Sequence, residues 1–372
     1  MAAEATDDVR NELEDVQAQT VIQAQTVVIE GGLGRVGYAG APPSKLLRFS
    51  VADFADLARR ALRDRGYSVH DAARAIDQDP GELGRVLAGV REPSVKIAND
   101  LDDLVGAGGA LAGTLMHPDD SVRVAGIAGH PSRMDEGTVE ATAGVLAALR
   151  RLDDSANPEC VLPATLAQMR EVTRMLKEAR GPHRDAFAAV ASEYIQFGGW
   201  LLAEVRRDAA AVKLLDEAVE LADEIGNGTL AAQALNFKGY LARQQGRQQG
   251  VARWFSAAAY TPGAHPAQRL GDLLQAAAGL GHLGKRDEAL RMLDEGARLM
   301  DEADRLPPPA TAYWLTPEFS RLSFGLSALA LGRHDEAADH LRSGLAGLPE
   351  ELRGAAWNRE YVEALEEAEA AR

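Results

Sequence analysis

The sequence predicts a mostly α-helical protein: a small amino-terminal domain of short helices followed by a carboxy-terminal α-solenoid of helix pairs. Hydrophobic residues make up 46% of the 372 residues but aromatic residues only 5%, which favours helices packed through small and medium side chains. Between Tyr67 and Ser94, two short helix patterns follow one another across a turn. From Glu136 onward the apolar spacing is helical, and turn-forming residues interrupt it at intervals of roughly 40 residues.

Residues 1–48 are predicted to form an arm that contains one short β-like segment. Residues 16–29 read VQAQTVIQAQTVVI, in which apolar and polar residues alternate as in a strand. A lone strand has an unpaired edge, so we expect this segment to pair with a second copy or another partner. Residues 31–43 predict a flexible connector. Their Gly-x-Gly-x-x-Gly spacing lacks the following helix that a dinucleotide-binding turn requires.

Residues 49–115 are predicted to form a helix-turn-helix domain. The first helix spans about residues 52–65 and has one apolar face. Ser68 is expected to cap the second helix, and Asp79 to cap the third, with Pro80 in its first position. This layout presents the polar side of the third helix outward, as in proteins that insert such a helix into the major groove of DNA.

The same stretch resembles the phage-repressor-like, xenobiotic-response-element family of helix-turn-helix regulators. The matching positions are Ser68, Ala73, Arg74, Ile76, Pro80, Arg85, Gly89, Arg91, Pro93 and Ser94. The resemblance implies that Glu82 and Arg85 read base edges, whereas Arg74 and Arg91 contact phosphates. The DNA-binding residues that follow from it are Ser68, Arg74, Gly81, Glu82, Arg85, Arg91 and Ser94.

The charge of this domain leaves a second interpretation open. Residues 49–105 contain eight Lys and Arg against eleven Asp and Glu, a net charge of −3, in a chain whose net charge is −16. Binding to DNA depends on basic side chains that neutralise phosphates. Gly81 and Gly84 also replace polar residues on the reading face of the family, and Asp77 replaces its usual turn glycine. The chain is therefore either a DNA-binding regulator or a non-enzymatic adaptor that binds proteins through both parts.

Residues 116–134 are rich in Gly and turn formers and predict a linker, and residues 135–372 predict the repeat domain. Within it, a turn followed by a helix recurs, and small residues are expected where the helices of a pair cross. The recurring segments are residues 206–222, 283–299 and 331–348, with a fourth unit at 230–258. The expected crossing residues are Ala211, Ala218, Ala222, Ala289, Ala297, Ala337 and Gly344.

These helix pairs resemble divergent tetratricopeptide repeats. Residues 135–366 are also similar to the carboxy-terminal region of large actinobacterial transcriptional regulators, with matching stretches such as VLAALRRLDD and LPEELRGAAWNREY. The groove of such an array suits a peptide, a small effector or a protein partner, and we also expect the array to form a homodimer. The candidate groove residues are Tyr194, Trp200, Gln233, Asn236, Lys238 and Tyr240, with ordinary packing between repeats as the alternative for Trp200 and Tyr240.

No catalytic residue, metal or cofactor is expected. Cys160 is placed in a loop between two prolines, and His334 and His340 are six residues apart, which does not suit a shared metal. A single cysteine favours a reducing, cytoplasmic location, and no apolar run approaches the roughly 18 residues of a membrane span. The expected partners are double-stranded DNA and a ligand of the groove, with no membrane.

Overall fold

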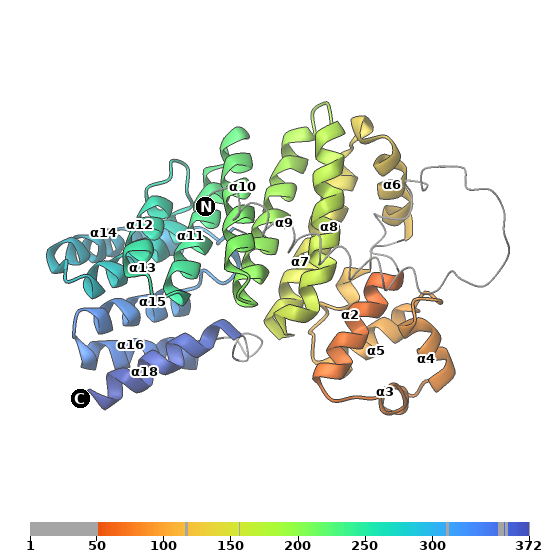
Figure 1. Ribbon diagram of the computed structural model, residues 1–372, viewed down its shortest axis with the longest axis horizontal. Helices are drawn as coiled ribbons and strands as arrows, with labels where there is room; N and C mark the ends of the chain where they lie inside the picture. The colour runs from red at the N-terminus through yellow and green to blue at the C-terminus, as the bar shows by residue number, and fades with distance from the viewer. Residues whose placement is uncertain are drawn as a thin grey trace, which may run out of the picture. The chain divides into compact units, whose positions relative to one another are not determined.

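A computed structural model describes residues 51–115, 118–155, 157–309, 312–348, 353 and 356–371. These residues form helices joined by turns, and no strand occurs among them (Figure 1). The all-α prediction is therefore confirmed for this part of the chain. The expected β-like segment at residues 16–29 and the rest of the predicted arm lie outside the described residues.

Four helices form the amino-terminal domain: α2 (Val51–Asp64), α3 (Val69–Ala75), α4 (Pro80–Leu87) and α5 (Val95–Val105). The Ser68 hydroxyl accepts a hydrogen bond from the backbone N–H of Asp71, and the Asp79 carboxylate accepts one from Glu82. Asp77, in the turn between α3 and α4, has a φ of +52°, a left-handed conformation that Asp tolerates better than most residues. The local capping signals thus set the helix boundaries of this domain.

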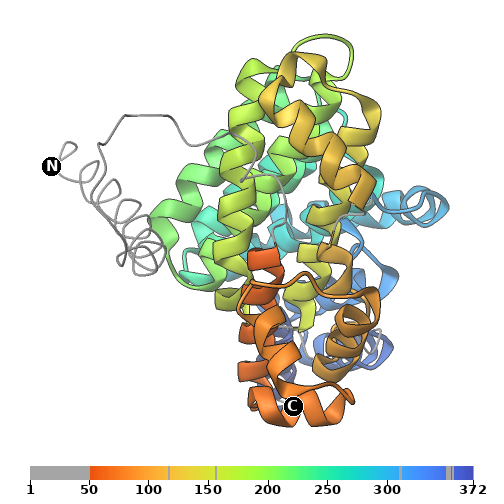
Figure 2. The same cartoon turned by 90° about the vertical axis from the view of Figure 1, so that its right-hand side faces the viewer.

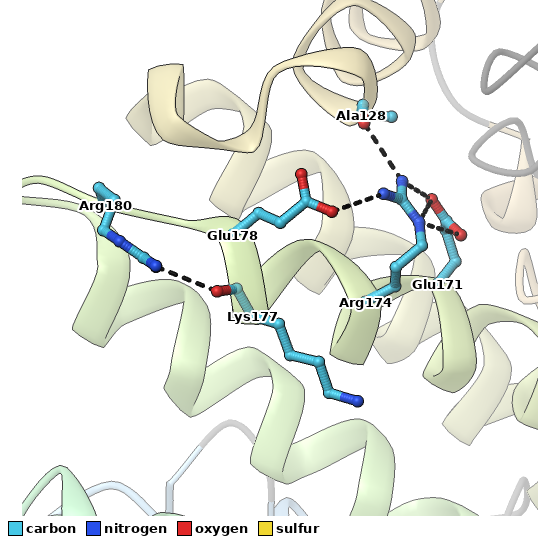
Figure 3. Close-up of polar contacts among 6 residues, drawn as sticks. All are labelled: Ala128, Glu171, Arg174, Lys177, Glu178 and Arg180. Carbon is cyan, nitrogen blue, oxygen red and sulfur yellow. Dashed lines mark hydrogen bonds and ion pairs between the residues drawn. The ribbon is translucent and has the colours of Figure 1, made fainter.

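The segment expected to be a linker at residues 116–134 contains a helix, α6 (Pro118–Gly129). It is flanked by the short 3₁₀ turns η2 (Ala112–Thr114) and η3 (Pro131–Arg133). Figure 3 shows how Arg174 fixes its end: the guanidinium donates to the Ala128 carbonyl at 3.2 Å while Glu171 orients it. The glycine content of this segment predicted a linker, and that prediction is wrong for residues 118–129. The helix end is stabilised by an arginine more than 40 residues away in the sequence, a contact that no local pattern reveals.

The remaining helices pack as antiparallel neighbours, in the paired manner of tetratricopeptide-like repeats (Figure 1). The bounds of the first set are α7 (Glu136–Ser155), α8 (Pro158–Glu178), α9 (Arg184–Glu204), α10 (Asp208–Glu224), α11 (Gly228–Gln244) and α12 (Gln248–Ala259). The second set comprises α13 (Pro266–His282), α14 (Arg286–Arg305), α15 (Pro317–Ala330), α16 (His334–Gly347), η5 (Ala356–Asn358) and α18 (Arg359–Ala370). The helix breaks predicted at proline and glycine positions fall between these elements.

One turn recurs four times between the paired helices and defines the repeats. At each turn a residue with positive φ precedes a basic residue, whose N–H bonds a carbonyl near the end of the first helix at 2.8–3.0 Å. Glycine supplies the positive φ at three turns, Gly246, Gly284 and Gly332, whereas Arg206 supplies it at the fourth with a φ of +60°. This arrangement closes a helix end through the left-handed conformation that glycine adopts most easily.

The buried core is continuous from the amino-terminal domain into the repeats. Phe54 and Leu83 of the first domain belong to the same buried cluster as Phe187 of α9. In Figure 2 the red and orange helices lie at one end of α7 and α8, and α2 packs against α8. The amino-terminal domain is therefore packed onto the repeats, and no extended linker separates the two.

Most of the predicted small crossing residues are buried, but Ala297 is exposed. In α14 the residues that face the partner helix are Ala289, Leu293 and Gly296, which lie four and then three positions apart. A Cβ on Gly296 would already touch Leu270 of α13 at 3.4 Å. The helix register therefore places Gly296, and not its neighbour Ala297, at the crossing.

Cys160 lies in the first turns of α8, where a loop was expected. Pro163 has no N–H to donate to the carbonyl of Glu159, four residues earlier in the helix. The Arg60 side chain of α2 donates to that carbonyl at 3.5 Å instead, so the helix tolerates the proline. The Cys160 thiol donates to the Asp64 carboxylate, and burial raises its pKa to about 12. Cys160 is thus a packing residue between α2 and α8.

No helix in the described ranges combines the length and the apolar character needed to cross a lipid bilayer.

Candidate functional site

The outer face of α4 is one candidate site. In the described structure α4 packs against α2 and α3 through Leu83, Val86 and Leu87, and the repeats do not cover it. Gly81 and Arg85 are exposed on the opposite side of the helix. The third helix of the domain is therefore presented outward, as the capping pattern predicted.

The three arginines on this face differ in whether a carboxylate forms an ion pair with them. Arg91 forms an ion pair with Glu82 at 2.9 Å, and Arg74 lies 3.4 Å from Asp71. The side chain of Arg74 is 80% exposed, so its ion pair is weak and leaves it accessible to a phosphate. Among the described residues, Arg85 has no carboxylate partner. The face thus offers Arg85 and Arg74 directly, whereas Arg91 must first leave Glu82.

Two further predicted DNA-binding residues have structural roles. Ser68 and Ser94 cap α3 and α5, and the Ser94 hydroxyl accepts from Ile97 at 3.2 Å. Between residues 69 and 94, five carboxylates accompany the three arginines. Whether the seven predicted residues contact DNA stays a prediction, and the acidic excess keeps the protein-binding alternative open.

An aromatic pocket on the repeats is the second candidate site. The space between its lining residues, with the open solvent at its mouth included, is about 690 Å³. The first helices of successive pairs line it, together with the loop before α15 and the start of α18. Its lining residues are Arg150, Asp153, Asp154, Phe197, Trp200, Asn236, Phe237, Tyr240, Arg243, Gln275, Tyr313, Trp314, Phe319, Trp357, Glu360 and Tyr361.

The aromatic rings of this pocket form one connected wall. The Trp200 ring lies 4.7 Å from that of Tyr240 and 5.2 Å from that of Phe237, measured between centroids. Phe237 in turn lies 5.9 Å from Trp314, whose ring meets that of Tyr313 edge to face at 5.4 Å. Such tilted and edge-to-face pairs are the favourable geometries for aromatic side chains.

Two neighbouring carboxyl groups of α7 form the acidic side of the pocket. Asp153 accepts a hydrogen bond from the indole N–H of Trp200 at 3.0 Å, and Asp154 accepts one from the Tyr313 hydroxyl. Burial raises the pKa of Asp154 to about 6. Burial also raises the pKa of Asp153 well above its usual value, and the neighbouring Asp154 and Glu204 raise it further.

The basic side chains of the pocket already have anionic partners. Arg243 of α11 binds Glu360 of α18 through two hydrogen bonds of 2.7 and 2.8 Å, and it also donates to Gln275. Arg150 pairs with Glu193 at 3.1 Å. Bidentate arginine–carboxylate pairs have a fixed geometry. Arg243 therefore ties α18 to α11 across the pocket.

Three of the six predicted groove residues line this pocket: Trp200, Asn236 and Tyr240. Tyr194 lies outside it, fully buried, and its hydroxyl donates to the Thr142 carbonyl of α7. Gln233 is buried in α11 away from the lining. Lys238 projects from the other side of α11, where it pairs with Asp216 and lies 3.7 Å above the Trp254 ring. These three are packing residues between repeats.

Sequence patterns did not predict two features of the pocket. The stripe Asn236, Tyr240, Arg243 continues at helical spacing, so extending it by one turn would have found Arg243. Tyr313, Trp314 and the residues of α18 reach the pocket from distant parts of the chain, and no local pattern places them there.

A buried carboxyl group supports the pocket from behind. Asp272 of α13 has no exposed surface and accepts hydrogen bonds from the amides of Asn236 at 2.6 Å and Gln268 at 2.9 Å. Burial raises its pKa to about 8, and the two hydrogen bonds offset part of that rise. Asp272 therefore fixes the orientation of Asn236, a residue of the pocket wall.

No protein-family model matches the chain, and no curated protein matches it in sequence. Among solved structures, aspartyl phosphate phosphatase F from Bacillus subtilis is similar, with 13% identity over 92% of this chain and 94% of that chain. The TM-score of this similarity is 0.39. At that identity and score, the likeness carries no inference about function.

Proposed function

We propose that this protein is a DNA-binding transcriptional regulator whose repeats bind a peptide, a small effector or a protein partner. The observation that carries the proposal is the outward face of α4, which the repeats leave uncovered and on which Arg85 is exposed. A helix held in this way by two neighbours suits insertion into a major groove. The aromatic pocket supports the second half of the proposal, because concave pockets whose apolar walls surround placed polar groups are typical ligand sites.

The proposal includes a homodimer, because readers of this class bind two half-sites about one helical turn apart. It includes no catalytic step and no metal. In the part of the chain that the structure describes, no group of three or more His, Cys, Asp or Glu is arranged to hold a metal ion.

A titration of DNA fragments tests the reading helix. Wild-type affinity should fall steeply between roughly 50 and 200 mM salt, because phosphate contacts release counterions. Arg85→Ala should cost about 1–3 kcal/mol and relax the preference at one base position. Arg298→Ala is the matched control: it removes one positive charge from exposed α14 and should leave DNA binding unchanged. Unaltered footprints for Arg85→Ala would show that α4 is not the reading helix.

The alternative is an adaptor that binds proteins through both parts. The specific observation in its favour is the acidic excess around α4, together with the pairing of Arg91 by Glu82. An adaptor predicts no salt-dependent DNA binding by the wild type and loss of a protein partner when Arg85 is replaced.

A further inference from the structure

We propose that the aromatic pocket binds the ammonium group of a ligand, with Asp153 and Asp154 as the counter-charge and the surrounding rings as its apolar wall. This inference rests on the proposed ligand-binding function of the repeats and names the chemistry of that ligand. It covers primary amines and the amino terminus of a peptide, which share one cationic group.

The first argument is the balance of charge. The two arginines of the pocket are neutralised by Glu193 and Glu360. Among the described residues, neither Asp153 nor Asp154 forms an ion pair; their partners are the neutral donors of Trp200 and Tyr313. Two adjacent carboxyl groups therefore have no cationic partner among these residues. Buried charges in proteins are normally paired, so this side of the pocket is suited to a positive guest.

The second argument is a free acceptor. Asp153 Oδ2 accepts from Trp200, but its Oδ1 is buried and accepts no hydrogen bond from any described residue. An unsatisfied buried oxygen is costly, and a donor that reaches it removes that cost. An ammonium group has three donors and no acceptor, so it fits this oxygen and the neighbouring carboxylate together.

The third argument is the wall of rings. Trp200 and Tyr313 hydrogen-bond the two carboxylates, and Tyr240, Phe237 and Trp314 extend the wall from them. Aromatic faces attract cations, most strongly in sites shielded from water. The same wall accepts a flat apolar group joined to the ammonium. The predicted ligand is thus an amine with an aromatic or aliphatic group close to its charge.

The test uses three probes that share a phenyl group and differ in the charge of their polar group, on the full chain without DNA. Binding of 2-phenylethylammonium, 2-phenylethanol and 3-phenylpropionate is measured by calorimetry and tryptophan fluorescence. We expect the ammonium to bind at least about ten times more tightly than the alcohol, and the anion not to bind. A phenylalanine amide dipeptide with a free amino terminus, against its acetylated form, shows whether a peptide terminus is preferred to a simple amine.

The double variant Asp153→Asn, Asp154→Asn removes the charge while its amide oxygens can still accept from Trp200 and Tyr313. It should bind the ammonium no better than the alcohol, and its melting temperature should stay equal or rise, because buried like charges are removed. Asp223→Asn, an exposed change on α10, is the matched control and should bind as wild type does. Equal binding of ammonium and alcohol, preference for the anion, no detectable binding of the ammonium probe, or undiminished binding by the double variant overturns the proposal. None of these results depends on whether α4 binds DNA.

Discussion

The two candidate sites of this chain are built in opposite ways. Helix α4 and its neighbour α3 come from one continuous stretch, residues 68–94, in which each helix begins at its own capping residue. The pocket is assembled from residues between Arg150 and Tyr361, contributed by five repeat helices, one loop, the turn η5 and α18. The first site is therefore set by local signals and the second by packing. Substitutions should separate these two modes of construction.

The largest expected effect comes from Leu83→Ala, which opens a cavity in the core that the amino-terminal domain shares with the repeats. Leu83 is fully buried, and such truncations cost about 2–5 kcal/mol. All four tryptophans lie in the repeats, at positions 200, 254, 314 and 357, so their fluorescence reports on the array alone. Because the core is continuous, the tryptophan-detected unfolding midpoint in urea should fall together with the midpoint seen by circular dichroism.

Val90→Ala, at a side chain that is 76% exposed, is the control and should shift neither midpoint. If the unfolding midpoint detected by tryptophan fluorescence stays at the wild-type value in Leu83→Ala, the amino-terminal domain and the repeats unfold independently.

The second effect is a dependence of stability on pH, caused by Asp272 behind the pocket. The raised pKa means that the folded state holds this proton more tightly than the unfolded chain, whose value is 3.8. The resulting stability is fully present below pH 4 and is lost as pH rises toward about 8. The slope for one such group is about 1.4 kcal/mol per pH unit.

Asp272→Asn is uncharged throughout this range. The difference in unfolding free energy between wild type and variant should therefore change with pH in the variant's favour from pH 5 to pH 8, as measured by urea unfolding. Asp154, with a pKa of about 6, contributes to both proteins and cancels in the difference. A difference that is constant over this range would show that Asp272 is ionised in the fold.

A smaller loss is expected from Asp79→Ala, which removes the cap of α4. The N–H of Glu82 would lose its partner, at a cost of about 1 kcal/mol in thermal or urea unfolding. Asp79→Asn keeps an acceptor oxygen in the same place and should restore most of the stability. If both variants are as stable as the wild type, the start of α4 is held by packing, and both candidate sites then depend on packing.

The smallest effect compares the repeat turns with one another. Arg206 has the positive φ that glycine has in the other three turns, and it gains an exposed ion pair with Asp208 at 3.1 Å. Arg206→Gly should stabilise the protein by about 0.5 kcal/mol, because relief of the backbone strain exceeds the value of an exposed ion pair. Gly246→Ala should cost about 1 kcal/mol in the same urea assay. If Gly246→Ala leaves the unfolding free energy unchanged, these turns do not require glycine.

Sequence patterns predicted the helices of the amino-terminal domain more completely than the pocket, for a physical reason. The caps at Ser68 and Asp79 act over three residues, so they can be recognised in the printed order of the chain. On the repeat helices the pattern identified which helices face the groove but not which turn of each helix reaches it. Tyr194 lies two turns before Trp200 on α9, and α7 covers it there.

The irregular spacing of the repeats had a consequence that the sequence alone did not reveal. The positive-φ residues of the turns fall at Arg206, Gly246, Gly284 and Gly332, and the last interval is the longest. Part of this longer interval is the loop before α15, which carries Tyr313 and Trp314 into the pocket. The departure from the repeat period therefore coincides with two residues of the pocket wall.

A map of chromosomal occupancy in living cells tests the regulator proposal most directly, with wild type and Arg85→Ala compared at equal expression. The wild type should occupy a limited set of discrete positions that share a sequence, and Arg85→Ala should lose them while Arg298→Ala keeps them. Uniform background for the wild type, or peaks that persist in Arg85→Ala, would contradict a reading role for α4.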